Sequence, residues 1–202
     1  MKTQAHSPAI LGWILSGAAT LAVLTTLDLQ GCATQSDAKN SDQAVIERGD
    51  YLVRVGGCND CHTPWKMGEH GPEPDMTRML SGHPQNFHVT PAKLEPGPWI
   101  AASSATNTSF SGPWGVSFAA NLTPDPATGL VMDEPMFKQA LRSGKHMGGG
   151  RPILPPMPWT AYGQMTDDDL HAVYSYLRTI PAIANEVPQP LPPSAPLMGE
   201  KQ

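Results

Sequence analysis

The sequence contains few charged residues and no run that is rich in lysine or arginine. It has 13 Lys and Arg residues against 18 Asp and Glu residues, so the formal net charge is -5 at pH 7. Nucleic-acid-binding domains need clustered positive charge to neutralise phosphates. The lack of such a cluster excludes that class of function, and we expect no nucleic-acid partner.

Long uninterrupted helices are also excluded. Proline (22) and glycine (19) make up about a fifth of the 202 residues, and both interrupt helices. Much of the chain must therefore be loop rather than a bundle of long helices. The apolar content of 40% is still sufficient for a buried core, and the length suits one domain.

Cysteine is scarce, and each cysteine fits a role other than a disulfide. The three are Cys32, Cys58 and Cys61. Cys32 follows an apolar stretch over residues 9–27 and the tripeptide Leu-Gln-Gly, an ending that resembles a bacterial lipoprotein box. We therefore expect a signal peptide over residues 1–31, a polar tether over residues 32–41, and a lipid on Cys32. This places the protein on a membrane facing the bacterial periplasm, and Ala33 favours the outer membrane.

Two alternatives for the N-terminus stay open. The apolar stretch over residues 9–27 is nearly long enough for an uncleaved membrane helix, and an ordinary signal peptide can be cut nearby. Asp28 is unusual for a lipoprotein box and for a membrane helix, because charge is costly in hydrocarbon. All three interpretations place the rest of the chain outside the cytoplasm.

Cap residues and apolar spacing predict three helices. The first begins at Ser41 or Asp42 and carries an apolar stripe that ends at Val55. Gly49 interrupts this stripe, which predicts that another backbone approaches closely there. The other two are expected from Asp133 to Gly144 and from Thr166 to a stop at Pro181.

The stretch from residue 63 to 120 shows no long helical period. A loop of this length without structure is unusual inside a compact domain. We expect an ordered, proline-rich and glycine-rich insertion, with a short strand over residues 114–118. The proline-rich tail over residues 188–202 is expected to be extended or disordered.

The chemistry is carried by Cys58-Asn59-Asp60-Cys61-His62, a C-x-x-C-H sequence. This is the attachment pattern of a c-type haem. Cysteines three residues apart lie on one side of a helical turn, where each can form a thioether with a haem vinyl group. We expect one covalent haem c on Cys58 and Cys61, with His62 as an axial ligand of the iron. A redox-active dithiol needs a thioredoxin-like βαβ context, and a zinc site needs two more ligands.

The second axial ligand is expected among the methionines and histidines that follow the motif. The candidate methionines are Met67, Met76, Met79, Met132, Met136, Met147, Met157 and Met165. Met157 is favoured because three prolines stiffen its loop, so that restricted φ angles hold the ligand at low entropic cost. A methionine ligand also raises the reduction potential. His146 and Met147 are the next candidates.

With these residues placed, the chain resembles a class I cytochrome c over residues 44–62 and 121–181. The resemblance is to haem domains of bacterial periplasmic cytochromes and of cytochrome subunits of membrane-bound dehydrogenases. The segments of this sequence that match those domains are Asn121 to Asp125, Pro155 to Pro158 and Asp168 to Leu177. It implies that Met157 is the distal iron ligand and that the first and last helices cross near Gly49 and Tyr174.

The resemblance implies a mostly α fold, with a small helical core around one haem over residues 42–187 that includes the insertion 63–120. We expect electron transfer with redox protein partners such as a dehydrogenase or a terminal oxidase, and no small-molecule substrate. The chain is thus expected to be an electron carrier rather than an enzyme. Two alternatives stay open: a haem enzyme or sensor with an open sixth position, and an obligate subunit of a dehydrogenase or oxidase.

Overall fold

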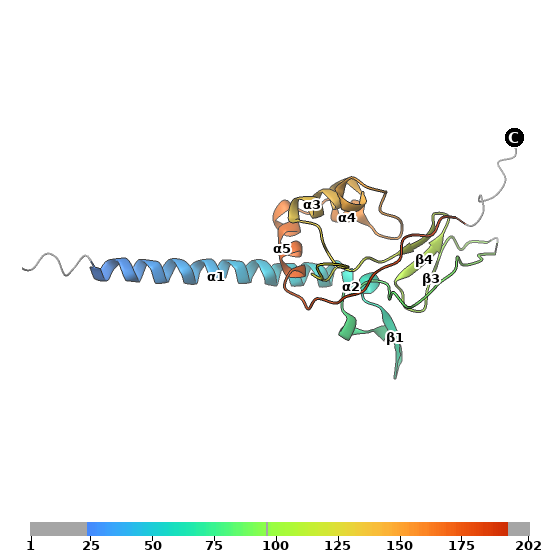
Figure 1. The fold of residues 1–202 in the computed structure, drawn as a ribbon, viewed down its shortest axis with the longest axis horizontal. Helices are drawn as coiled ribbons and strands as arrows, with labels where there is room; N and C mark the ends of the chain where they lie inside the picture. Colours follow the sequence, from blue (N-terminus) through green and yellow to red (C-terminus); the bar gives the residue numbers. More distant parts are fainter. Residues whose placement is uncertain (1–23, 96, 194–202) are drawn as a thin grey trace, which may run out of the picture. The chain divides into compact units, whose positions relative to one another are not determined.

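The computed structural model in Figure 1 describes the backbone of residues 24–95 and 97–193, and side chains from residue 39 onward. The chain divides into two units, residues 1–42 and 43–202. Most of the predicted signal peptide and the side chain of Cys32 lie outside the described residues. Over residues 24–95 and 97–193, no helix combines the length and the apolar content that a membrane span requires.

The predicted start of the first helix at Ser41 or Asp42 is wrong. Helix α1 (Leu24–Val55) begins earlier and continues from one unit into the other. Residues 32–41, which were expected to be a tether, are helical in this structure. They contain neither proline nor glycine, so nothing in this stretch interrupts the helix.

Within the second unit, α1 crosses helix α5 (Asp167–Leu177) at Gly49, as the interrupted stripe predicted. A Cβ atom added to Gly49 would lie 2.0 Å from the carbonyl oxygen of Ala172 and 2.6 Å from the Cβ of Tyr176. Only glycine allows the two helices to approach so closely. The prediction that Val55 belongs to the apolar face is wrong, because this side chain is 60% exposed.

The other two helices are confirmed together with their caps. In α3 (Glu134–Ser143), the Asp133 side chain accepts a hydrogen bond from the backbone N–H of Met136, and Gly144 ends the helix at φ 67°. In α5, the Thr166 side chain accepts from the backbone N–H of Asp169. Both caps satisfy N–H groups that have no partner inside a helix.

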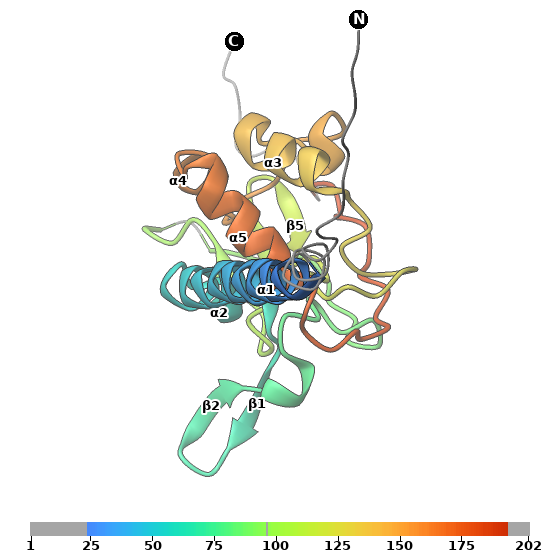
Figure 2. The same cartoon turned by 90° about the vertical axis from the view of Figure 1, so that its left-hand side faces the viewer.

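These helices share one apolar core. Its buried members include Val53 of α1, Phe137 of α3, and Leu170 and Leu177 of α5. Tyr174 adds an aromatic contact, with its ring centroid 5.6 Å from that of Phe137. Figure 2 shows α5 passing across α1 beside α3 within this unit.

All strands of the described residues lie between residues 63 and 120, and the predicted strand over residues 114–118 is confirmed. One antiparallel hairpin projects from the rest of the unit (Figure 2), and a second antiparallel sheet has the order β3-β4-β5. The strands are β1 (Trp65–Gly68), β2 (Gly71–Pro74), β3 (Ala102–Ser103), β4 (Ser109–Gly112) and β5 (Gly115–Phe118). The short helices are α2 (Cys58–His62), α4 (Trp159–Tyr162), η1 (Met76–Arg78) and η2 (His146–Gly148).

The segment after α5 returns along the stranded region. Asn185 is 1% exposed, and its side-chain amide donates to the backbone carbonyls of Ser81 and His83. Its amide oxygen accepts from Arg78 Nη2 and from the backbone N–H of Gln85. This one side chain therefore attaches the C-terminal segment to residues 78–85.

The tail was expected to be extended or disordered. Up to residue 193 it is extended, and Leu191 pairs with Val116 of β5 through two backbone hydrogen bonds of 2.9 and 3.0 Å. The remainder of the tail lies outside the described residues.

Candidate haem-binding site

The C-x-x-C-H motif forms the short helix α2, directly after the end of α1. Gly57 lies between the two helices with φ 68°, a left-handed conformation that glycine adopts without strain. Cys58 and Cys61 are free thiols, three residues apart on one helical turn. Cys58 packs against the apolar core. The two free thiols thus have the sequence spacing of the haem-attachment pattern and lie on one helix.

The two other uses of a C-x-x-C sequence find little support. Burial raises the pKa of the Cys58 thiol to about 11, which disfavours the thiolate that a redox-active dithiol needs. A zinc site requires further ligands nearby. The described residues contain no group of three or more His, Cys, Asp or Glu side chains that can hold a metal ion.

The ring of His62 is oriented by a backbone carbonyl. Its Nδ1 lies 2.8 Å from the carbonyl oxygen of Ala120, and because that oxygen only accepts, Nδ1 carries the proton. None of the described residues forms a hydrogen bond with Nε2. Burial also lowers the pKa of His62 and favours the neutral ring that binds metals. The donor set fits a haem: two free thiols and an oriented imidazole with a free Nε2.

The stranded region holds the motif in place. The Thr63 hydroxyl donates to the side chain of Asn59 (2.9 Å) and accepts from the backbone N–H of Leu80 (2.9 Å). The side-chain amide of Asn107 donates to the carbonyl of Asp60 (2.9 Å). Because Leu80 lies 17 residues from Thr63 and Asn107 lies 47 residues from Asp60, folding of the insertion fixes the motif.

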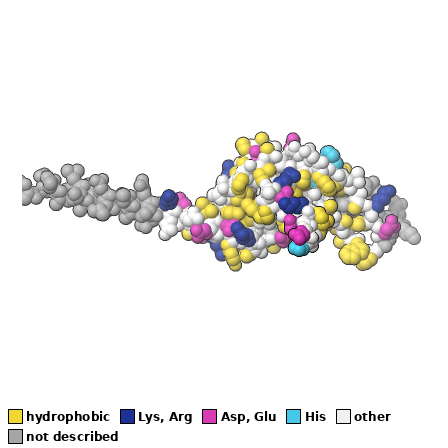
Figure 3. Space-filling view, turned by 90° about the horizontal axis from the view of Figure 1, so that it is seen from below, with side chains coloured by type: hydrophobic (Ala, Val, Ile, Leu, Met, Phe, Trp, Pro, Cys, Tyr) yellow, Lys and Arg dark blue, Asp and Glu magenta, His cyan; other side chains and the backbone are white. Residues whose placement is uncertain are grey.

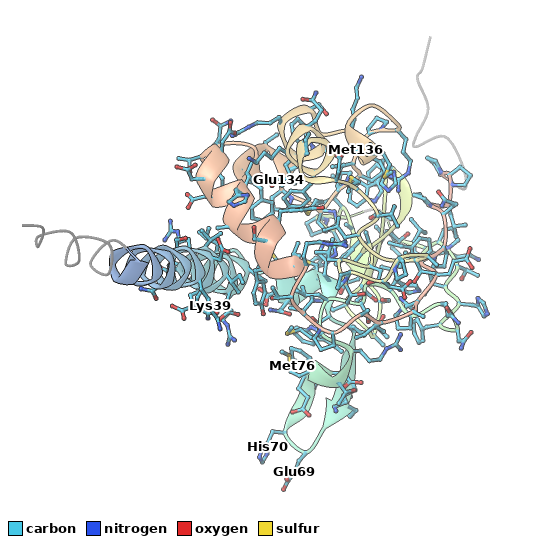
Figure 4. All side chains as sticks on the ribbon, turned by 60° about the vertical axis from the view of Figure 1, so that its left-hand side comes forward. Lys39, Glu69, His70, Met76, Glu134 and Met136 are labelled. Atoms are coloured by element: carbon cyan, nitrogen blue, oxygen red, sulfur yellow. The ribbon has the colours of Figure 1, made fainter. Side chains whose placement is uncertain are left out.

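The structure divides the candidate methionines into two groups by their exposure. The exposed ones are Met67, Met76, Met136 and Met147, between 36% and 77% exposed. Figure 4 shows Met76 near the base of the projecting hairpin, with His70 at its tip. The partly buried ones pack against the apolar core and are Met79, Met132, Met157 and Met165. His146 is exposed as well, so neither of the next candidates has the burial of Met157.

The loop around Met157 is anchored on both sides. The Ser117 hydroxyl of β5 donates to the carbonyl oxygen of Pro155 at 2.5 Å. After the methionine, the indole of Trp159 packs over Gly144, where an added Cβ would lie 2.4 Å from the ring. The loop is therefore positioned by β5 and by the end of α3.

Helix α4 connects this loop to the motif. The Tyr162 hydroxyl donates to the carbonyl oxygen of Gly56, at the end of α1. Its ring also lies near Gly56, where an added Cβ would be 3.5 Å from Tyr162 and 3.9 Å from the sulfur of Cys58. The chain after Met157 therefore returns to the cysteines.

Sequence analysis missed Ser117, Ala120 and Asn185. Ala120 acts only through its carbonyl, which no side-chain pattern reveals. The Asn121 to Asp125 segment was noted only as a resemblance. Its Asn121 amide donates to the carbonyls of Ile183 (2.8 Å) and Asn185 (3.3 Å), so this segment holds the returning chain. An Asn side chain that accepts from the residue two positions on, here Thr123, is a common local turn, but it does not identify a distant partner.

No family model matches the chain. It is 27% identical over 168 residues to the cytochrome c subunit of a quinone alcohol dehydrogenase of Gluconobacter oxydans, covering 82% of this chain and 26% of the relative. The chain is similar to cytochrome c subunits of dehydrogenases. A fructose dehydrogenase cytochrome subunit of Gluconobacter japonicus is 24% identical (79% of this chain, 26% of the relative), and a gluconate 2-dehydrogenase cytochrome c subunit of Pantoea cypripedii is 26% identical (76% and 26%).

The chain spans about a quarter of the length of these relatives. Their names describe cytochrome or cytochrome c subunits of dehydrogenases. This agrees with the expectations of a c-type haem and of an electron carrier rather than an enzyme.

Proposed function

We propose that this chain is a monohaem class I c-type cytochrome that transfers electrons as a partner of a dehydrogenase. The observation that carries the proposal is the C-x-x-C-H motif on α2, with two free thiols and a His62 ring whose Nε2 is free. A haem bound there supplies a one-electron carrier that alternates between the ferrous and ferric states. The crossing of α1 and α5 at Gly49 supports the class I fold.

Met157 is proposed as the residue that would hold the haem iron together with His62. Met79 is a weaker candidate because it adjoins Leu80, whose N–H donates to Thr63 directly after the motif. That segment is thus attached directly to the chain end of the motif that would hold the haem through His62. Met157 sits in a separate loop beside the apolar core, and as a haem ligand its thioether would favour ferrous iron and raise the reduction potential.

Substitution of Met157 tests this assignment. We expect Met157→Ala to lose the ferric methionine–sulfur absorption band and to lower the reduction potential, while haem attachment persists. Met165→Ala is the matched control, since Met165 also packs against the apolar core. An unchanged band and potential in Met157→Ala would refute the ligand assignment. Rapid binding of carbon monoxide by the untreated protein would instead indicate an open sixth position.

Haem attachment is tested separately by intact mass. The purified protein should carry the mass of one haem that survives denaturation, and Cys58→Ala with Cys61→Ala should remove it. Covalent haem in the double variant, or a second haem in the unaltered protein, would contradict the proposal.

Membrane attachment is proposed to occur through lipid on Cys32, with the domain in the periplasm. The lipoprotein-like ending before Cys32 supports this. Cys32→Ala should move the protein from the membrane to the soluble periplasmic fraction and lower its mass by that of the lipid. Retention of Cys32→Ala in the membrane would favour an uncleaved N-terminal helix.

The proposed partner is a dehydrogenase that donates electrons, with a terminal oxidase as an acceptor. Figure 3 shows acidic, basic and hydrophobic side chains interspersed on one face, with no field of a single charge. Docking through such a face depends weakly on salt. Co-purification of a dehydrogenase from detergent extracts, and reduction of the haem when its substrate is added, would support this partner. The proposal would be contradicted if the cytochrome purified without any dehydrogenase and if membranes supplied with substrate did not reduce its haem.

A further inference from the structure

One short segment of the insertion forms a hydrogen bond with His62 and another with the loop that contains Met157. Ala120 accepts the hydrogen bond from His62 Nδ1, and Ser117, three residues earlier, donates to the Pro155 carbonyl in the loop of Met157. His62 and Met157 are separated by most of the cytochrome domain in sequence. The groups that contact His62 and the Met157 loop, the Ala120 carbonyl and the Ser117 hydroxyl, thus belong to one continuous segment, residues 115–120.

This segment is held on both of its edges. On one edge, β5 pairs with β4 in the register Ser117↔Phe110, and the N–H of Ala119 donates to the Thr108 carbonyl (2.8 Å). On the other edge, Val116 exchanges two backbone hydrogen bonds with Leu191. A strand paired on two edges shifts little, so its Ser117 and Ala120 contacts keep a fixed spacing.

The contact at Pro155 matters because the loop has few other polar groups to hold it. Pro155, Pro156 and Pro158 have no backbone N–H, so among residues 155–158 only Met157 can donate from the backbone. A side-chain donor to a loop carbonyl is therefore one of the few available anchors. Ser117 is 7% exposed, and its hydroxyl is 2.5 Å from the Pro155 oxygen against 3.4 Å from the Phe110 oxygen.

We propose that the insertion serves as a brace for both axial ligands, and that Ser117 is the positioning residue for Met157. This inference rests on the proposed function, in which Met157 binds the iron. Ala120 orients the imidazole on one side, and Ser117 sets the distance of the methionine loop on the other. Loss of the Ser117 hydroxyl weakens the methionine side and leaves the histidine side intact.

The test titrates the ferric protein with imidazole, which displaces Met157 from the iron. Loss of the methionine–sulfur absorption band reports the displacement. Ser117→Ala removes one buried hydrogen bond, so its apparent affinity for imidazole should rise roughly fivefold. The band should also weaken before imidazole is added. Haem attachment through the cysteines should be unchanged, as judged by intact mass.

Ser109→Ala is the matched control. Ser109 is buried in the neighbouring strand β4, opposite Phe118, and its hydroxyl has no hydrogen-bond partner among the described residues. This variant should bind imidazole as the unaltered protein does. An equal rise in Ser109→Ala and Ser117→Ala would overturn the inference, because it would reflect general loosening of the sheet.

Two further variants separate the possible failures. Ser117→Thr keeps the hydroxyl on a strand that favours threonine, and it should restore the imidazole affinity of the unaltered protein. If Ser117→Ala does not retain haem, recovery of the methionine band in Ser117→Thr supports the brace, and its absence overturns it. If Met157→Ala keeps the band, the proposed ligand is wrong. If Met157→Ala loses the band but Ser117→Ala behaves as the unaltered protein, only the brace is wrong.

Discussion

The helical region (residues 43–62 and 121–180) and the stranded region (residues 63–120) are stabilised by different kinds of core. Most buried apolar side chains belong to the helical region, and most buried polar side chains belong to the stranded region. In the stranded region, His83 is fully buried between the Thr108 hydroxyl at Nδ1 and the Phe87 carbonyl at Nε2. Its ring also packs on Phe118 with centroids 4.7 Å apart.

This difference in core type predicts how much stability each region loses when one of its residues is substituted. An apolar core is non-directional and loses stability in proportion to the area or volume removed. A buried polar network is directional, so removal of one member leaves several groups without partners. The stranded region should therefore depend on single residues more strongly than the helical region does.

The largest expected effect is at Asn185. Asn185→Ala leaves the Ser81 and His83 carbonyls without a donor, which should lower the free energy of unfolding by about 4 kcal/mol. Hydrogen exchange should accelerate in residues 78–88 while α3 and α5 remain protected. Asn86→Ala, an exposed amide in the same segment, is the control and should have little effect. Uniform loss of protection in both regions would contradict the comparison.

The next effect concerns the helix crossing. On an open helix surface, glycine to alanine stabilises by about 1 kcal/mol. At Gly49 the added Cβ meets the Ala172 carbonyl, so overpacking of about 3 kcal/mol outweighs this gain, and Gly49→Ala should lose about 2 kcal/mol net. Urea unfolding measures the change. Ala44→Leu, on the exposed side of α1, is the control, and stabilisation by Gly49→Ala would show that the helices do not meet there.

A smaller effect is expected from pH. Burial holds the pKa of His83 below its ordinary value of 6.5, and the charges of Arg78 and His88 lower it further. The unfolded chain therefore takes up this proton first, so stability is lost as the pH falls below about 6.5. Urea unfolding at pH 7 and pH 5 should show a smaller difference in His83→Gln. His70→Gln, at the exposed hairpin tip, should keep the full dependence, and equal slopes in both variants would exclude His83 as the source.

The smallest effect is expected from the ion pair that joins α1 to α5 at the surface. Arg48 lies 3.0 Å from Asp169, with its side chain 51% exposed. Arg48→Gln should cost about 0.5 kcal/mol, because solvent screens the pair. The loss should shrink further in high salt. A cost comparable to that of Gly49→Ala would show that charge, rather than close packing, holds the crossing together.

Local signals were sufficient for helices α3 and α5. The caps Asp133 and Thr166 and the stop at Gly144 act within a few residues of where they stand, so their sequence positions predicted α3 and α5. The start of α1 was wrong because a capping residue marks only a permitted start. Nothing in residues 32–41 prevents the helix from continuing.

The sequence by itself predicted haem attachment at Cys58, Cys61 and His62, because two cysteines and a histidine on one helical turn need only local geometry to be recognised. It also favoured Met157, and the structure reduces the eight candidate methionines to four that touch the core. Only the tertiary structure decided what supports these residues. The Ala120 carbonyl lies 58 residues from His62, and Asn185 lies about a hundred residues from its partners. Hydrogen bonds over such separations depend on the completed fold, since backbone carbonyls are the same in every residue and only folding selects which of them meet.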